Sequence, residues 1–125
     1  MINIKPDMIN AFEANKDLIN LLGGNKIYFM VKPEKDESGK EILPPYITYF
    51  EITNFDDDYL DNKAYSSEIH IQVDIWCKGS TSKIAEEVDK TMKSLNFKRT
   101  SSADLYEDDT KIFHKGMRFE TRKIN

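Results

Sequence analysis

The sequence is poor in cysteine, in long apolar runs and in surplus positive charge. Its 125 residues include one cysteine, Cys77, so no disulfide can form within the chain. No stretch approaches the roughly 20 apolar residues of a membrane-spanning helix, and the first residues show no signal peptide. We therefore expect a soluble protein of a reducing compartment, the cytoplasm, with no membrane partner.

Basic residues are outnumbered in this chain. There are 18 Lys and Arg against 22 Asp and Glu, which gives a formal net charge of −4. A protein that wraps duplex DNA needs a basic face for phosphate contacts, so the balance argues against tight DNA binding. What is present is a hydrophobic fraction of 39 %, including 7 Phe and 6 Tyr. That supply suits one core, and we treat residues 1–125 as a single domain.

The clearest pattern in the chain runs over Glu68–Cys77, near its middle. Apolar and polar residues alternate strictly there, which predicts a β-strand with one buried face. β-branched side chains occupy the apolar positions and suit a pleated surface. These positions are Ile69, Ile71, Val73 and Ile75. We expect this segment to be the central strand of an antiparallel sheet.

Helical periodicity occurs on both sides of that strand. Apolar residues recur at spacings of three and four from Pro6 to Leu22, and Gly23 ends this first predicted helix. A second predicted helix follows Gly79 and ends near Asn96 by the same pattern. Two helices are therefore expected to bury apolar stripes against the sheet.

The remaining segments read as strands and connections. Strands are predicted at Lys26–Val31, Tyr46–Thr53, Phe97–Ser101 and Lys111–Ile124, with a bulge at Gly116 in the last. Polar loops are predicted at Lys32–Leu43 and Asn54–Ser67, and an acidic turn at Asp104–Asp109. The order of elements predicts an α+β fold, a mainly antiparallel sheet with two helices packed on one face.

Four aspartates in the second predicted loop raise the question of a metal site. They are Asp56, Asp57, Asp58 and Asp61. A calcium loop counted from Asp57 would need glycine where Asn62 stands. We therefore predict no metal there, and interpret the aspartates as a mobile loop or as a surface facing the lumen of an assembly.

The two histidines, His70 and His114, fall on the polar faces of two predicted strands. They would lie close together if those strands pair, but two histidines without cysteine partners are weak evidence for zinc. Cys77 lacks a CxxC partner, and no serine stands in a GxSxG elbow. We therefore predict no enzyme, no cofactor and no metal.

The polar faces of these strands offer candidates for an interface instead. Trp76 and His70 project from the central strand, opposite the isoleucines, and tryptophan is enriched at interfaces. Arg118 and Arg122 add a small basic cluster on the last strand. On a chain of net charge −4, these cations suit a protein partner at least as well as nucleic acid.

Several segments together resemble one family. They are Leu22–Gly24 with Ile27–Tyr28, Pro45–Tyr49, Ile71–Trp76 and the ending Asp104–Asp109 to Phe113–Phe119. The chain resembles the small tail completion or head–tail joining proteins of long-tailed phages and prophages of Gram-positive bacteria. The likeness covers nearly the whole chain and brings no catalytic residue with it.

The resemblance implies a subunit that forms a ring, of six copies, at the head-proximal end of the tail tube. Such a ring ends tube growth and joins the tail to the head connector protein, while DNA passes through without specific binding. It implies the bacterial host cytoplasm during assembly and the head–tail junction of the virion afterwards. The alternative interpretation is a small adaptor or regulator that binds a host protein.

Overall fold

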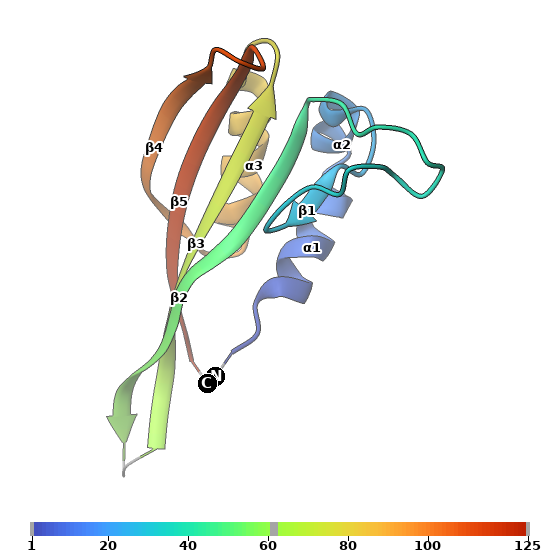
Figure 1. Ribbon diagram of the computed structural model, residues 1–125. Helices are drawn as coiled ribbons and strands as arrows, with labels where there is room; N and C mark the ends of the chain where they lie inside the picture. Colours follow the sequence, from blue (N-terminus) through green and yellow to red (C-terminus); the bar gives the residue numbers. More distant parts are fainter. Residues whose placement is uncertain (1, 61–62, 125) are drawn as a thin grey trace.

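The computed structural model describes residues 2–60 and 63–124 of the chain. A five-stranded sheet of order β1-β2-β3-β5-β4 is covered on one face by three helices, which lie behind it in Figure 1. The pair β1–β2 is parallel and the other pairs are antiparallel. The elements are α1 (Lys5–Ala14), α2 (Lys16–Leu22), β1 (Ile27–Phe29), β2 (Tyr46–Leu60), β3 (Lys63–Cys77), α3 (Ser82–Ser94), β4 (Lys98–Glu107) and β5 (Ile112–Ile124). The fold is α+β, as predicted, but the sheet is mixed.

The core lies between the sheet and the helices, and β3 runs through its middle. The alternating isoleucines and valine of β3 are all buried, because the helices cover this face and β2 and β5 flank the strand in the sheet. Met117 and Phe119 of β5 pair with Val73 and Ile71 and point into the same layer. The helices add Met8, Phe12, Leu18, Leu22, Ile84, Val88 and Met92. The predicted central strand is confirmed.

The first predicted helix is in fact two helices, so three helices cover the sheet instead of two. Asn15, which falls inside the single helix predicted from Pro6 to Leu22, adopts an extended conformation between α1 and α2. Its side-chain oxygen accepts a hydrogen bond from the Leu18 amide at 3.1 Å, and its amide nitrogen donates to Thr91 at 3.0 Å. Asparagine competes well for such capping bonds, which favours a break. Among the described residues, no helix is long and apolar enough to span a membrane.

The predicted loop Asn54–Ser67 is wrong, because β2 and β3 continue through it as one long hairpin. Pairing extends from Tyr46 opposite Trp76 to Leu60 opposite Lys63. The partner of Ser66 on the other side is Ile124, the last residue of β5, so the hairpin projects beyond the sheet as a two-stranded arm (Figure 1). Among the arm side chains that the structure describes, Phe55, Asp56, Tyr59 and Lys63 are exposed, so no alternation of buried apolar residues marks them as a strand.

The predictions around β4 also need correction. Lys98–Glu107 is one strand, whereas we expected a short strand followed by an acidic turn from Asp104. The turn itself is confined to the residues between Glu107 and Ile112. Gly116 lies in unbroken register with β3, and the register shift falls in β4 beside Thr100. A bulge therefore does not explain why glycine occupies position 116.

Candidate functional site

An aromatic row crosses one end of the sheet on the face that the helices leave open. Trp76 lies between its two cross-strand partners, Tyr46 and His114. The indole stacks on the imidazole with ring centroids 3.8 Å apart and on the phenol ring at 6.0 Å. Its Nε1–H donates to the Thr48 hydroxyl at 3.0 Å. Trp76 thus packs against neighbours within the chain and stays partly exposed, and its place in an interface remains a prediction.

Asp74 forms the centre of a polar network beside this row. Its carboxylate, only 5 % exposed, lies 2.8 Å from His114 Nε2 and accepts a bond from Gln72 Nε2 at 2.9 Å. Arg118 Nε in turn donates to Gln72 Oε1 at 3.1 Å. Such mutual bonding satisfies a buried carboxylate and fixes the histidine. The network joins β3 to β5 through the side chains of Asp74, Gln72, His114 and Arg118.

Gly116 belongs to this network by leaving room for it. A Cβ at this position would lie 3.1 Å from Asp74 Oδ1 and 3.4 Å from Gln72 Nε2. Because both atoms are tethered by hydrogen bonds, neither can retreat without breaking one. We predict that Gly116→Ala lowers the free energy of unfolding by about 1 kcal/mol in urea denaturation, the strain exceeding the gain in strand propensity. Gly79→Ala, where a Cβ meets nothing within 4 Å, is the control; equal effects would contradict this role.

His70 lies on the same open face but far from His114, so the expected proximity of the two histidines is wrong. Both strands do pair, yet His70 faces Glu120 while His114 faces Trp76, six positions along the strand. His70 Nε2 lies 3.4 Å from Glu68 Oε1, and Nδ1 lies 3.8 Å from Glu120 Oε2. The imidazole thus sits between two carboxylates.

These three groups are close enough to raise the question of a metal ion. One donor atom from each of Glu68, His70 and Glu120 lies within 4.8 Å of the others. Two cations flank them, however, because Arg122 is the register partner of Glu68 and Lys98 that of Glu120. Neighbouring cations compete with an added metal for the carboxylates. The arrangement favours a surface ion-pair network, and the absence of a metal site stays a prediction.

Asp56 and Asp57, the two arm aspartates whose side chains the structure describes, do not converge on one point. Asp57 accepts a hydrogen bond from Arg122 at 2.7 Å, and Asp56 accepts one from the Ser67 hydroxyl at 3.3 Å. The two carboxylates follow each other along a strand, so they point to opposite faces. The Asp58 side chain and all of Asp61 lie outside the described residues. Arg122, a candidate interface residue, thus braces the base of the arm.

We predict that neither calcium nor the aspartate charges contribute much to folding. Replacing Asp56, Asp57, Asp58 and Asp61 with asparagine should cost less than about 1 kcal/mol, because exposed ion pairs are weak. Added calcium should leave the thermal midpoint unchanged in the parent and in the variant alike. A calcium-dependent rise that Asp57→Asn abolishes would establish a metal loop instead.

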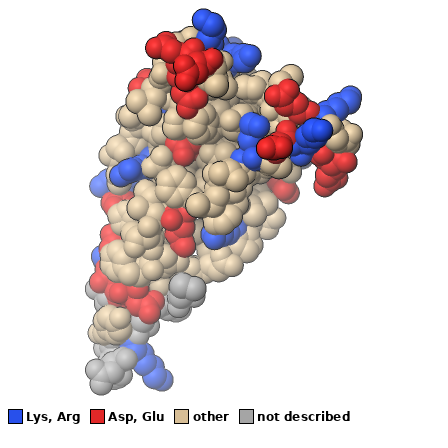
Figure 2. Space-filling view, in the orientation of Figure 1, with Lys and Arg blue, Asp and Glu red and all other residues tan. Residues whose placement is uncertain are grey.

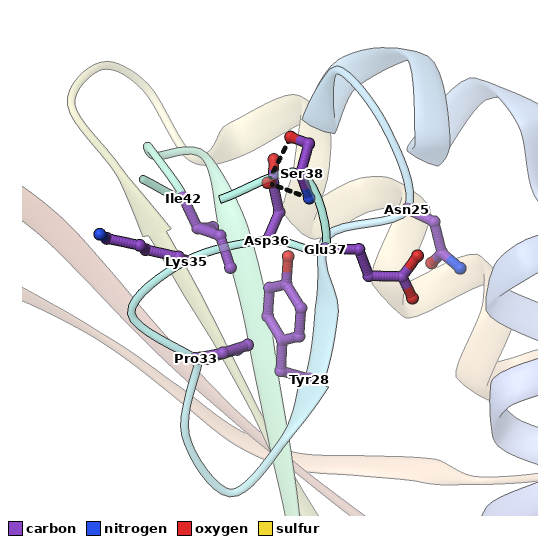
Figure 3. A pocket seen from close by; sticks show the side chains of 8 residues that line it. All are labelled: Asn25, Tyr28, Pro33, Lys35, Asp36, Glu37, Ser38 and Ile42. Carbon is purple, nitrogen blue, oxygen red and sulfur yellow. Dashed lines mark hydrogen bonds between the residues drawn. The ribbon is translucent and has the colours of Figure 1, made fainter. Parts of the chain in front are cut away.

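A pocket of about 500 Å³ lies beside β1, under the connection to β2 (Figure 3). Tyr28 points into it, and Asp36 caps a tight turn by accepting bonds from the Ser38 hydroxyl at 2.6 Å and the Lys40 amide at 3.0 Å. These bonds, that from Ser38 first, lower the pKa of Asp36. Burial, together with the Asp36 charge, raises the pKa of Tyr28. The pocket combines apolar groups of Tyr28, Pro33 and Ile42 with polar side chains, and the turn capped by Asp36 forms one of its walls.

One edge of the sheet is open along its whole length. All ten residues of β4 are exposed, and only β5 pairs with this strand. At its far end three large apolar side chains are uncovered: Leu105, Tyr106 and Phe113. Acidic side chains gather at this end of the molecule, beside a few basic ones (Figure 2). An open strand edge with exposed apolar groups is a template for pairing with another chain.

The opposite edge, formed by β1, is short and apolar. Phe29, Met30 and Val31 are all exposed, Val31 by 73 %. Met30 has a φ of 68°, in the left-handed region that non-glycine residues seldom adopt, and its amide donates to Tyr49 O at 2.9 Å. The bend ends β1 and presents Val31 outward. The two edges therefore differ in length, shape and composition.

The sequence patterns predicted neither of the two exposed edge surfaces. Tyr106 and Leu105 were assigned to an acidic turn, and Phe29–Val31 to an ordinary strand. The available signal was the presence of large apolar residues in segments otherwise too polar to belong to the core. The four candidate interface residues all contact neighbours within the chain. Trp76 stacks on His114, and Arg118 donates to Gln72. His70 lies near the Glu68 carboxylate, and Arg122 donates to Asp57.

Comparisons with known proteins give a family match and structural matches. The sequence profile of the family described as tail completion protein gp17 matches residues 6–123. A chain from the structure "Virion of native gene transfer agent (GTA) particle" superposes with a TM-score of 0.62 at 10 % sequence identity. That alignment covers 94 % of this chain and 92 % of the other. No curated protein sequence matches the chain.

Proposed function

Because the chain belongs to the tail completion protein gp17 family, we propose that it forms a ring at the head-proximal end of a phage or prophage tail tube. Proteins of this family are structural components of phage-like virions and are not enzymes. In our proposal the ring, of six copies, ends growth of the tail tube and joins the tail to the head connector protein. It is assembled in the cytoplasm of the bacterial host, which we take to be Gram-positive.

The observation that supports this proposal is that the two edge strands of the sheet, β1 and β4, are both open and differ from each other. A ring needs a head-to-tail interface, in which two different surfaces of one subunit meet their counterparts on its neighbours. β1 and β4 supply two such surfaces. If the rotation from one subunit to the next returns to the first subunit after a whole turn, the assembly is a closed ring and not a filament. The polar networks of the open face, which lack a nucleophile, are consistent with a role in assembly.

The mass of the particle in solution tests the proposal most directly. We expect light scattering of the purified protein, alone or with tail-tube protein, to show a closed oligomer of defined size. Electron microscopy should show this oligomer capping one end of the tubes. A strict monomer that ignores both tubes and connectors would favour the alternative, an adaptor or regulator that binds a host protein.

In this proposal the acidic arm lines the channel through which DNA passes. If the aspartates of the arm face the lumen of the ring, their repeated negative charge keeps DNA phosphates from adhering. We then expect rings in which all four aspartates are replaced by lysine to form normally and to release DNA more slowly. An unchanged rate of DNA release would place the arm elsewhere.

The connection between β1 and β2 offers a further test of assembly. Lys32–Leu43 is mostly exposed and carries few apolar anchors, so we expect fast amide exchange there in the free subunit. Exchange in this segment, or in the arm over Asn54–Ser67, should slow when the ring forms or docks on the tube. Strong and equal protection in the free subunit would show that both segments are already packed.

A further inference from the structure

We infer that the pocket beside β1 binds a lysine or arginine side chain of another virion protein (Figure 3). The pocket belongs to the single subunit, whereas the identity of the partner rests on the proposed function. About 500 Å³ of space lies between β1 and the connection that leads to β2. This volume falls within the usual range of binding sites, about 300–1,000 Å³, so the pocket can accept a long side chain.

Apolar groups form one part of the pocket wall. Tyr28 points into the pocket from β1, and Pro33 and Ile42 line it from the connection (Figure 3). The aliphatic stem of lysine or arginine packs on such surfaces while its charged end stays among polar groups. The face of the Tyr28 ring adds an electrostatic attraction for a cation within about 6 Å of its centre. This wall therefore suits a long cationic side chain better than a compact ion.

Asp36 provides a fixed negative charge at this pocket. Its Oδ1 accepts hydrogen bonds from the Ser38 hydroxyl at 2.6 Å and from the amides of Ser38 and Lys40 at 2.9 and 3.0 Å. These bonds, the one from the hydroxyl first, lower the pKa of Asp36, so the carboxylate is ionised at neutral pH. Because all three bonds end on Oδ1, Oδ2 keeps lone pairs for the donors of an incoming side chain.

Two further acceptor groups line the pocket beside Asp36. Glu37 adds a second exposed carboxylate. Asn25 donates its amide nitrogen to Glu13 at 3.1 Å, and its carbonyl oxygen lies on the side of Glu37 (Figure 3). An ammonium group carries three donors and a guanidinium group five, and neither carries an acceptor. Such groups complement a wall rich in acceptors, whereas a phosphate or a carboxylate would find few donors there.

Charge favours a cation of a partner protein over nucleic acid. Among the described residues that line the pocket, Lys35 is the one cation, and its amino group points away from Tyr28 and from both carboxylates (Figure 3). The other charges that line the pocket are negative, so they attract a cation and repel phosphates. The connection that forms the pocket is mostly exposed in the single subunit, so a side chain of a neighbouring protein can reach it.

Titration with model compounds tests the pocket in the protein alone. We expect N-acetyl-arginine amide and N-acetyl-lysine amide to shift the NMR signals of the Tyr28, Asp36 and Ser38 amides. N-acetyl-citrulline amide, which resembles the arginine compound but is neutral, should leave them unchanged. Glu37→Lys should raise the apparent dissociation constant at least about fivefold, because it replaces an attraction with a repulsion.

The matched control for this titration is Glu34→Lys. It makes the same change of charge in the same exposed connection, but Glu34 does not line the pocket. In about 0.15 M salt, which screens distant charges, we expect this variant to bind the model compounds as the parent does. Equal shifts with the neutral compound, or equal weakening by Glu34→Lys and Glu37→Lys, would overturn the inference.

Complementation separates this inference from the proposed function. In a phage that lacks the gene, the parental chain and Glu34→Lys, each supplied from a plasmid, should restore joined particles equally. We expect Glu37→Lys to form rings but to give at least about tenfold fewer joined particles, because the added lysine repels the cation of the partner. Full restoration by Glu37→Lys would overturn the inference and leave the proposed function standing. Normal particles without any copy of the gene would contradict the proposed function and with it the identity of the partner, while the titration would still decide whether the pocket binds a cation.

Discussion

Replacing Ile71 with aspartate should abolish folding of the subunit. Ile71 is 1 % exposed in the middle of β3, with the side chains of β2 and β5 beside it and the helices above it. No cation among the core residues could pair with the new carboxylate, so the variant must bury an uncompensated charge or lose this layer. The cost, several kcal/mol, is comparable to the whole stability of an ordinary domain, about 5–15 kcal/mol.

Circular dichroism during urea titration measures this effect. The conservative control is Ile71→Val, which removes one methylene and should lower the free energy of unfolding by only about 0.5–1.5 kcal/mol. We expect a folded control and an Ile71→Asp variant that is unfolded or aggregated without denaturant. A cooperative transition of nearly parental midpoint in Ile71→Asp would mean that the helix-covered core is assigned to the wrong face of β3.

Deleting the gene from a phage or prophage that encodes it should separate heads from tails. Without the ring, the open end of the tail tube stays available for further subunits, and the head connector finds no partner. We expect filled heads and free tails, many of them longer than normal, when lysates are viewed by electron microscopy. Supplying the parental chain from a plasmid should restore joined particles.

The complementing plasmid also gives the deletion experiment its internal control. Ile71→Val, which keeps the core filled, should restore joined particles, whereas Ile71→Asp, which cannot fold, should not. Normal joined particles in the deletion strain itself would refute the proposed function.

Much of the fold could be predicted from the sequence because it depends on local periodicity. The alternation in Glu68–Cys77 identified the central strand, and the spacing of apolar residues in Ser82–Ser94 identified α3. Both patterns exist because one face of each element is buried along its whole length. The arm lacks this signal: strand pairing holds it together, but large described side chains such as Phe55 and Tyr59 are exposed, so the segment was predicted as a loop.

The sequence by itself therefore determined the class of fold, the face of β3 that enters the core and the family likeness. Only the tertiary structure decided which strands stand at the edges, that Trp76 is enclosed between Tyr46 and His114, and that His70 and His114 lie apart. Edges and cross-strand neighbours depend on register and strand order, which join residues distant in the chain. No local pattern encodes them, and the candidate assembly surfaces are made of such neighbours.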